Sequence, residues 1–217
     1  MKKTLLFTTA ALLTAVASFS TINSQENAMS FFITSVGSGD GANLGGLAGA
    51  DAHCSALATA AGSRGKTWRA YLSTSATATT DAVDARGRIG FGPWYNAKGV
   101  MVAENLNRLH SEFMDLGKEN SLTENGDMVN GRGDTPNQHD ILTGSGPDGY
   151  TMPSGTDTTC NNWTSNDEGS AMVGHFDRTG GGQRPNSFNS AHASRGCSQE
   201  DLIGTGGNGY FYCFAID

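Results

Sequence analysis

The side chains of this chain that could do chemistry gather in one polar segment, residues 119 to 140. No apolar period runs through the segment and glycines recur within it, which is typical of a long surface loop with a functional role. Its carboxylates and amides are the oxygen ligands that hard cations prefer. The candidate ligand-binding residues are Asn125, Asp127, Asn130, Arg132, Asp134, Asn137, His139 and Asp140.

Calcium is the candidate cofactor of this segment, with Glu124, Asp127 and Asp134 as its candidate ligands. The spacing of these acids is not that of an EF-hand loop. The alternative is a solvated loop that Asp and Asn stiffen by bonding to the nearby backbone, without any ion. The sequence favours this second interpretation.

The tripeptide Arg132-Gly133-Asp134 is one that integrins recognise, but three residues carry little specificity. We expect Arg132 and Asp134 to pair with neighbours in the loop instead. Such an exposed pair contributes less than about 1 kcal/mol.

The chain shows no established catalytic or metal-binding spacing. His139 and Asp140 could orient a metal or act as a base, yet a surface turn is the simpler interpretation. The five histidines form no His-x-x-x-His or Cys/His pattern, and there is no Gly-x-Ser-x-Gly elbow. Because paired carboxylates of a glycosidase meet only in space, an extracellular hydrolase stays as an alternative to a non-enzyme.

One helix and one strand must carry this loop. Small or apolar residues recur every three or four positions from Leu44 to Ala61, which predicts an amphipathic helix, and Gly62 suits its left-handed end. Asp51 falls early, where a helix favours negative charge. A strand over residues 68 to 72 follows and places alternate side chains on opposite faces.

Further strands are predicted at residues 31–35, 171–176 and 210–216. The last run is apolar enough to be buried on both faces, and Asn208-Gly209 predicts a turn before it. Residues 100–103 favour a strand or a short helix. We expect three tryptophans in the core: Trp68, Trp94 and Trp163.

The start of the chain is typical of a secretory signal peptide at residues 1–17, too short to span a bilayer. Residues 18–30 predict a flexible leader, and residues 31–217 a single domain. Loss of Lys2 and Lys3 moves the net charge from -7 to -9, so nucleic acid is not an expected partner. We expect a secreted or periplasmic protein without membrane insertion.

Two groups of motifs carry a resemblance to a known family. The segments 47–54 (LAGADAHC) and 68–73 (WRAYLS) form the first, and residues 160–165 (CNNWTS), Gly174-His175-Phe176, Cys197 and 210–216 (YFYCFAI) form the second. Pro93-Trp94 and residues 139–142 match more weakly. From about Phe31 to Asp217 the chain resembles endostatin, a domain of the C-type-lectin-like fold, and it is more similar to secreted bacterial endostatin-like proteins.

The resemblance implies an α+β fold with a twisted, mostly antiparallel sheet, two helices and long loops. It implies the disulfide pairs Cys54–Cys213 and Cys160–Cys197, with Trp163 in the core beside the second pair. Four exported cysteines alone allow three pairings, and the sequential pairing, Cys54–Cys160 with Cys197–Cys213, remains the alternative.

The chain also departs from the family. The Glu-Pro-Asn, Gln-Pro-Asp and Trp-Asn-Asp motifs of calcium-dependent lectins are missing. Endostatin's basic patch and zinc-binding histidines have no counterpart, so heparin is not an expected ligand.

Our hypothesis is a secreted binding and adhesion module that recognises an extracellular glycan, or a host or matrix protein, through its long polar loops. The alternatives are a structural surface or matrix protein without a small-molecule site, and a polysaccharide hydrolase. A concave patch of aromatic and amide groups would favour binding, and two facing carboxylates would favour hydrolysis.

Overall fold

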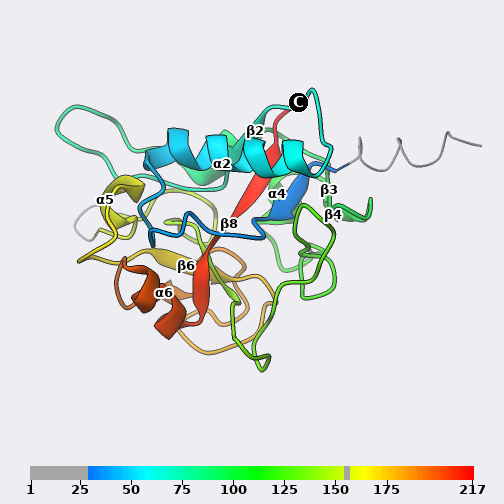
Figure 1. Cartoon of the computed structure of the whole chain (residues 1–217). Helices are drawn as coiled ribbons and strands as arrows, with labels where there is room; N and C mark the ends of the chain where they lie inside the picture. Colours follow the sequence, from blue (N-terminus) through cyan, green and yellow to red (C-terminus); the bar gives the residue numbers. More distant parts are fainter. Residues whose placement is uncertain (1–28, 154–156) are drawn as a thin grey trace, which may run out of the picture.

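The computed structural model describes residues 29–153 and 157–217, and its centre is one long strand, β8 (Gly207–Ala215). Figure 1 shows β8 crossing the molecule beneath the long helix α2 (Gly46–Ala60). The signal peptide and residues 18–28 of the expected leader lie outside the described residues. Met29 and Ser30, which we assigned to the leader, are buried, because the Ser30 carbonyl accepts a hydrogen bond from Ala215 at the end of β8.

The main sheet is mixed, with all its pairings antiparallel except that of β5 with β8. Its order is β1-β8-β5-β6-β7, and β2 also pairs with β8. A separate pair of short strands, β3 and β4, lies beside it. The remaining strands are β1 (Phe31–Ile33), β2 (Trp68–Ala70), β3 (Trp94–Tyr95), β4 (Met101–Ala103), β5 (Asp140–Leu142), β6 (Met172–His175) and β7 (His192–Ala193).

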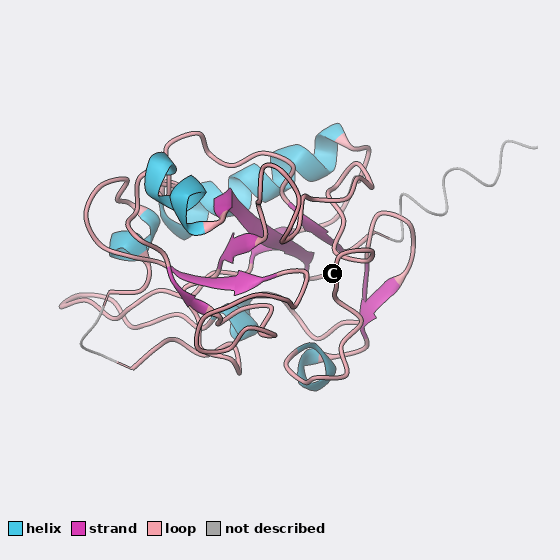
Figure 2. Ribbon diagram, turned by 90° about the horizontal axis from the view of Figure 1, so that it is seen from below, coloured by secondary structure: helices cyan, strands magenta, loops and turns pink. Residues whose placement is uncertain are grey.

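Helices other than α2 are short, and Figure 2 shows how little of the structure is helical outside α2. They are α3 (Ala85–Arg88), α4 (Leu106–Leu109), α5 (Cys160–Trp163) and α6 (Gln199–Thr205). The α+β class is therefore confirmed, with more helical turns than the two helices that we expected.

Side chains of β8 alternate between two hydrophobic cores, as the pleat of a strand requires. Phe211 and Cys213 belong to the core beneath α2, and Tyr212 and Phe214 belong to a second core. The second core is covered mainly by loops, with buried apolar residues such as Met114 and Phe188. The prediction of a strand buried on both faces is confirmed, but β8 already begins at Gly207, so Asn208-Gly209 is strand rather than turn.

The long helix lies close to its predicted position, but its buried side is different. Ala48, which we placed on the apolar stripe, is exposed, whereas Ala50 and Asp51 are buried with Cys54. Asp51 lies beyond the first turn of α2, so it does not interact with the positive end of the helix dipole as we expected. Its carboxylate accepts hydrogen bonds from Arg69, Arg88 and the backbone N–H of Ala70.

The four cysteines form the pairs Cys54–Cys213 and Cys160–Cys197, so the nested pairing is confirmed and the sequential one is wrong. The first bond joins α2 to β8 across one core. Trp68, Trp94 and Trp163 are all buried as expected. Within the described ranges, no helix is long and apolar enough to cross a membrane.

Candidate functional site

The polar segment from 119 to 140 is not one exposed loop. Residues 121–124 are buried and bridge to β1 and to Met128, and Asp140 opens strand β5. The interpretation of His139 and Asp140 as a surface turn is wrong, because both residues are buried. The exposed fraction is 5% for His139 and 3% for Asp140. Asp140 pairs with strands β6 and β8, and this pairing places both His139 and Asp140 at the sheet rather than in a surface turn.

The three candidate calcium ligands are engaged separately or point to solvent. Glu124 accepts hydrogen bonds from the backbone N–H and the hydroxyl of Ser35. Asp134 pairs with Lys118, and Asp127 is exposed. Among the described residues, the acids and histidines that come close enough together for a metal are different ones.

Neighbouring residues bond to the Arg132-Gly133-Asp134 tripeptide. Asp134 pairs as expected, whereas Arg132 is bonded through its backbone. Asp134 Oδ2 accepts a hydrogen bond from Gly131 N at 2.8 Å, in addition to its ion pair with Lys118. The backbone N–H of Arg132 donates to Asp177 Oδ2 at 2.6 Å. Of the other candidates, Asn125 is exposed, Asn130 is half-buried, and Asn137 Oδ1 accepts a 3.4 Å hydrogen bond from His139 N.

The structure brings His139 and Asp140 together with two histidines that we had not singled out, His175 and His192. The reason is the sheet. Asp140 on β5 is the cross-strand partner of His175 on β6, and His192 opens β7, the next strand along. We call these four residues the histidine cluster.

The cluster is centred on one carboxylate oxygen, Asp140 Oδ1. It lies 3.3 Å from His139 Nε2, 3.3 Å from His175 Nε2 and 3.6 Å from His192 Nε2. The Nε2 atoms of His175 and His192 are 3.0 Å apart. Despite these short distances, neither carboxylate oxygen of Asp140 has a hydrogen-bond partner among the described residues while the three Nε2 atoms are unprotonated.

A hydrogen bond at the Nδ1 atom fixes the orientation of each imidazole ring. His139 Nδ1 lies 3.1 Å from Asp177 Oδ1, His175 Nδ1 lies 2.8 Å from the Pro185 carbonyl, and His192 Nδ1 lies 3.1 Å from the Ala193 carbonyl. Because a carbonyl or a carboxylate oxygen can only accept, each Nδ1 is the protonated nitrogen. In the neutral rings, the Nε2 lone pairs then face the cluster.

Local charges shift two pKa values here. Burial lowers the pKa of His175, but a hydrogen bond that only the protonated ring can give to Asp140, the Pro185 carbonyl, and the negative charges of Asp140 and Asp177 outweigh it, so that this pKa is raised overall. Burial raises the pKa of Asp177, but hydrogen bonds from His139, Arg132 and Thr179 outweigh it and lower this pKa to about 2. Asp177 therefore carries its negative charge at neutral pH.

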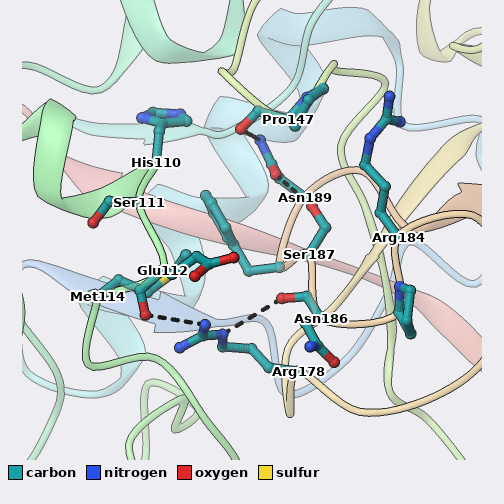
Figure 3. Close-up of a pocket in the computed structure, with 12 residues that line it drawn as sticks. His110, Ser111, Glu112, Met114, Pro147, Arg178, Arg184, Asn186, Ser187 and Asn189 are labelled. Carbon is teal, nitrogen blue, oxygen red and sulfur yellow. Dashed lines mark hydrogen bonds between the residues drawn. The ribbon is translucent and has the colours of Figure 1, made fainter.

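A hollow of about 540 Å³ lies beside the cluster, on the segment that joins β6 to β7 (Figure 3). Arg178 lies at one end, where its guanidinium donates to the carbonyls of Glu112 and Asn186. Pro147 and Asn189 lie at the other end. The hollow is lined by His110, Ser111, Glu112, Met114, Pro147, Arg178, Arg184, Pro185, Asn186, Ser187, Phe188 and Asn189.

The wall of the hollow is held by a hydrogen-bonded chain of Asn189, Tyr71 and His110. Asn189 Nδ2 donates to the Tyr71 hydroxyl at 2.9 Å, and His110 Nε2 lies 2.8 Å from the same oxygen. His110 Nδ1 donates to the Leu106 carbonyl, so Nε2 accepts from Tyr71. Burial lowers the pKa of His110, and it raises that of Tyr71.

Sequence reasoning missed the hollow and half of the histidine cluster. His175 and His192 are 17 positions apart and belong to no local motif. His175 follows the apolar run at residues 171–173, but His192 follows none, so nothing in the sequence places the two side by side.

Comparison with known proteins adds no assignment: no protein-family model matches the chain, and neither does any curated protein.

Proposed function

We propose that this chain is an extracellular binding domain of the C-type-lectin-like, endostatin-like type that recognises a saccharide unit of a glycan in the hollow beside Arg178 and Arg184. The observation that carries the proposal is the hollow itself. Its volume of about 540 Å³ is in the range of small-ligand sites, roughly 300–1,000 Å³. It offers the exposed amide of Asn186 for hydroxyl groups and the exposed ring of Pro147 for a sugar face, whereas Phe188 and Asn189 form its buried wall.

The two arginines favour a sugar that carries a carboxylate. A guanidinium matches a carboxylate with two parallel hydrogen bonds. Arg178 is fixed by two backbone carbonyls, whereas the exposed guanidinium of Arg184 has no partner in the described part of the chain. Arg184 is thus available to a ligand.

The alternatives have less support. A protein partner needs about 800 Å² of surface on each side, which a hollow of this size does not by itself suggest. A polysaccharide hydrolase needs two facing carboxylates, and Glu112 is the one acid among the described residues that line the hollow. Two disulfides are typical of the oxidising compartments where extracellular glycans are met.

The test is binding of the oxidised protein to an array that pairs neutral glycans with uronic-acid-containing ones. We expect binding to acidic members, and Arg184→Ala should weaken it by about 10- to 100-fold, the value of a hydrogen bond to a charged group. Arg64→Ala, which removes an exposed arginine outside the hollow, is the matched control. Equal binding by both variants, or no binding to any glycan, would contradict the proposal.

A further inference from the structure

We propose that the histidine cluster is a transition-metal site in which His139, Asp140, His175 and His192 bind one divalent ion, zinc by preference, through their Nε2 atoms and Asp140 Oδ1. The inference is independent of the glycan proposal, since it concerns other side chains.

The electrostatics of the cluster favour a cation. With every Nδ1 proton donated outward, the unprotonated Nε2 atoms of three rings lie 3.3, 3.3 and 3.6 Å from the carboxylate oxygen Asp140 Oδ1. Such an arrangement is repulsive without positive charge at its centre. A proton between His175 and His192 would serve one contact, whereas a divalent cation serves every donor at once.

Asp140 is a buried carboxylate. Its side chain is 2% exposed, and both of its oxygens lack a hydrogen-bond partner in the described part of the chain while the rings are neutral. An isolated buried carboxylate is costly unless it is paired or binds a metal. No lysine or arginine pairs with Asp140 in the described ranges, so its charge is balanced either by a protonated ring of the cluster or by a metal ion, and only the ion can be shared by several donors.

The distances between donor atoms also bear on the size of the ion. Zinc binds imidazole nitrogen and carboxylate oxygen at about 2.0–2.2 Å, so the donor atoms of a tetrahedral site lie about 3.3–3.5 Å apart. The donor separations centred on Asp140 Oδ1 are 3.3, 3.3 and 3.6 Å, and His175 and His192 are 3.0 Å apart. The donor atoms of His139, Asp140 and His175 thus all lie within 4.8 Å of one another, and His192 Nε2 lies beside two of them.

The surroundings also fit a metal ligand set. A ligating histidine usually donates its other N–H to a carboxylate or a carbonyl, as all three rings do here. The Gly180 and Gly182 backbones lie directly against the rings. A β-carbon at Gly180 would be 2.7 Å from His175 Cε1, and one at Gly182 would be 2.8 Å from His192 Cδ2.

The donor set selects the class of ion. Three imidazoles and one carboxylate suit zinc and its first-row neighbours, whereas calcium takes six to eight oxygen ligands. Four protein donors would complete a tetrahedron once the stacked His139 and His175 rings turn toward the ion, so the ion's role would be structural. It would fasten the ends of β5, β6 and β7 at the base of the segment that carries the hollow.

The decisive experiment uses the full chain without a histidine tag, stripped with EDTA and titrated with zinc, cobalt or calcium. We expect one equivalent of zinc to bind. Zinc at about 100 times its dissociation constant should raise the unfolding midpoint by roughly 5–10 °C. Cobalt should give the visible absorption bands of a tetrahedral site, and calcium should produce neither effect.

Three variants test which side chains contribute to zinc binding. His192→Gln changes the most exposed ligand and should weaken zinc binding by more than about 100-fold, while Asp177→Asn, which changes the partner of His139, should weaken it by about 10- to 100-fold. His53→Gln is the matched control, since His53 bonds to the Val36 carbonyl elsewhere. Absence of a midpoint shift and of cobalt bands in the wild-type chain would overturn the proposal, as would equal zinc affinity of His192→Gln and His53→Gln.

Discussion

At the scale of single residues, Asp51 is the carboxylate that joins the long helix to the strand after it. Its Oδ1 accepts from Arg88 Nη2 at 2.6 Å and from Ala70 N at 2.9 Å, and its Oδ2 accepts from Arg69 Nη1 at 2.7 Å. The Arg88 side chain is only 13% exposed. Removal of one partner from such a pair leaves a charge without compensation in a site where water cannot replace it.

We therefore expect Asp51→Asn to lower the free energy of unfolding by about 3 kcal/mol. Urea unfolding measures it, and Asp81→Asn, at an exposed position, should change it by less than about 0.5 kcal/mol. Equal effects of the two variants would show that the Asp51 network contributes little.

His110 gives the protein a pH dependence whose sign follows from burial. Its pKa in the folded state lies below the ordinary 6.5, so the unfolded state takes up the proton first as the pH falls. The free energy of unfolding should then decrease as the pH falls below about 6.5. Urea unfolding at pH 7.5 and 5.5, with EDTA throughout, should show a smaller loss for His110→Gln than for the wild type. Identical losses would contradict this assignment.

At the scale of elements, strand β6 and the segment after it approach each other so closely that only glycine fits between them. A β-carbon on Gly174 would lie 1.8 Å from the Phe188 carbonyl oxygen. That backbone belongs to the wall of the hollow, so it cannot move without disturbing Phe188 and Asn189.

Gly174→Ala should accordingly destabilise the protein by about 3 kcal/mol or more, the upper range for overpacking. Gly117→Ala is the control, because a β-carbon there meets no atom within 4 Å. Thermal unfolding of both variants is the measurement, and a Gly174→Ala midpoint equal to that of Gly117→Ala would show that the segment is free to shift.

At the scale of the whole molecule, two disulfides close loops of very different length. Cys54–Cys213 spans 159 positions and Cys160–Cys197 spans 37. In the loop-entropy account, the longer loop restricts the unfolded chain more, and the two bonds contribute up to about 5 and about 4 kcal/mol.

Replacement of both cysteines of a pair by alanine should show this order. The Cys54/Cys213 double variant should lose more free energy of unfolding in urea than the Cys160/Cys197 double variant. The reverse order would mean that local packing around Trp163, rather than chain entropy, decides the contribution of each bond.

Much of the fold could be predicted because it depends on local pattern. The strands predicted at residues 31–35 and 210–216 contain the apolar runs 31–33 and 210–216, and the helix after Leu44 has a period of three to four. These patterns persist in the structure because burial of apolar surface drives folding wherever the chain concentrates it. The disulfide pairing came from the resemblance, not from the spacing of the cysteines.

What only the tertiary structure decided is which polar groups meet. The sequence by itself determined that His139 and Asp140 are neighbours, yet it carried no sign that His175 and His192 would join them. Pairing across β5, β6 and β7 depends on strand register, which is set by contacts distant in sequence. Asp51 likewise became a buried ion-pair partner because β2 and Arg88 pack against α2. Hydrophobic patterning indicates where strands and helices form, whereas the polar clusters, and the exact buried side of α2, follow from how those elements align in space.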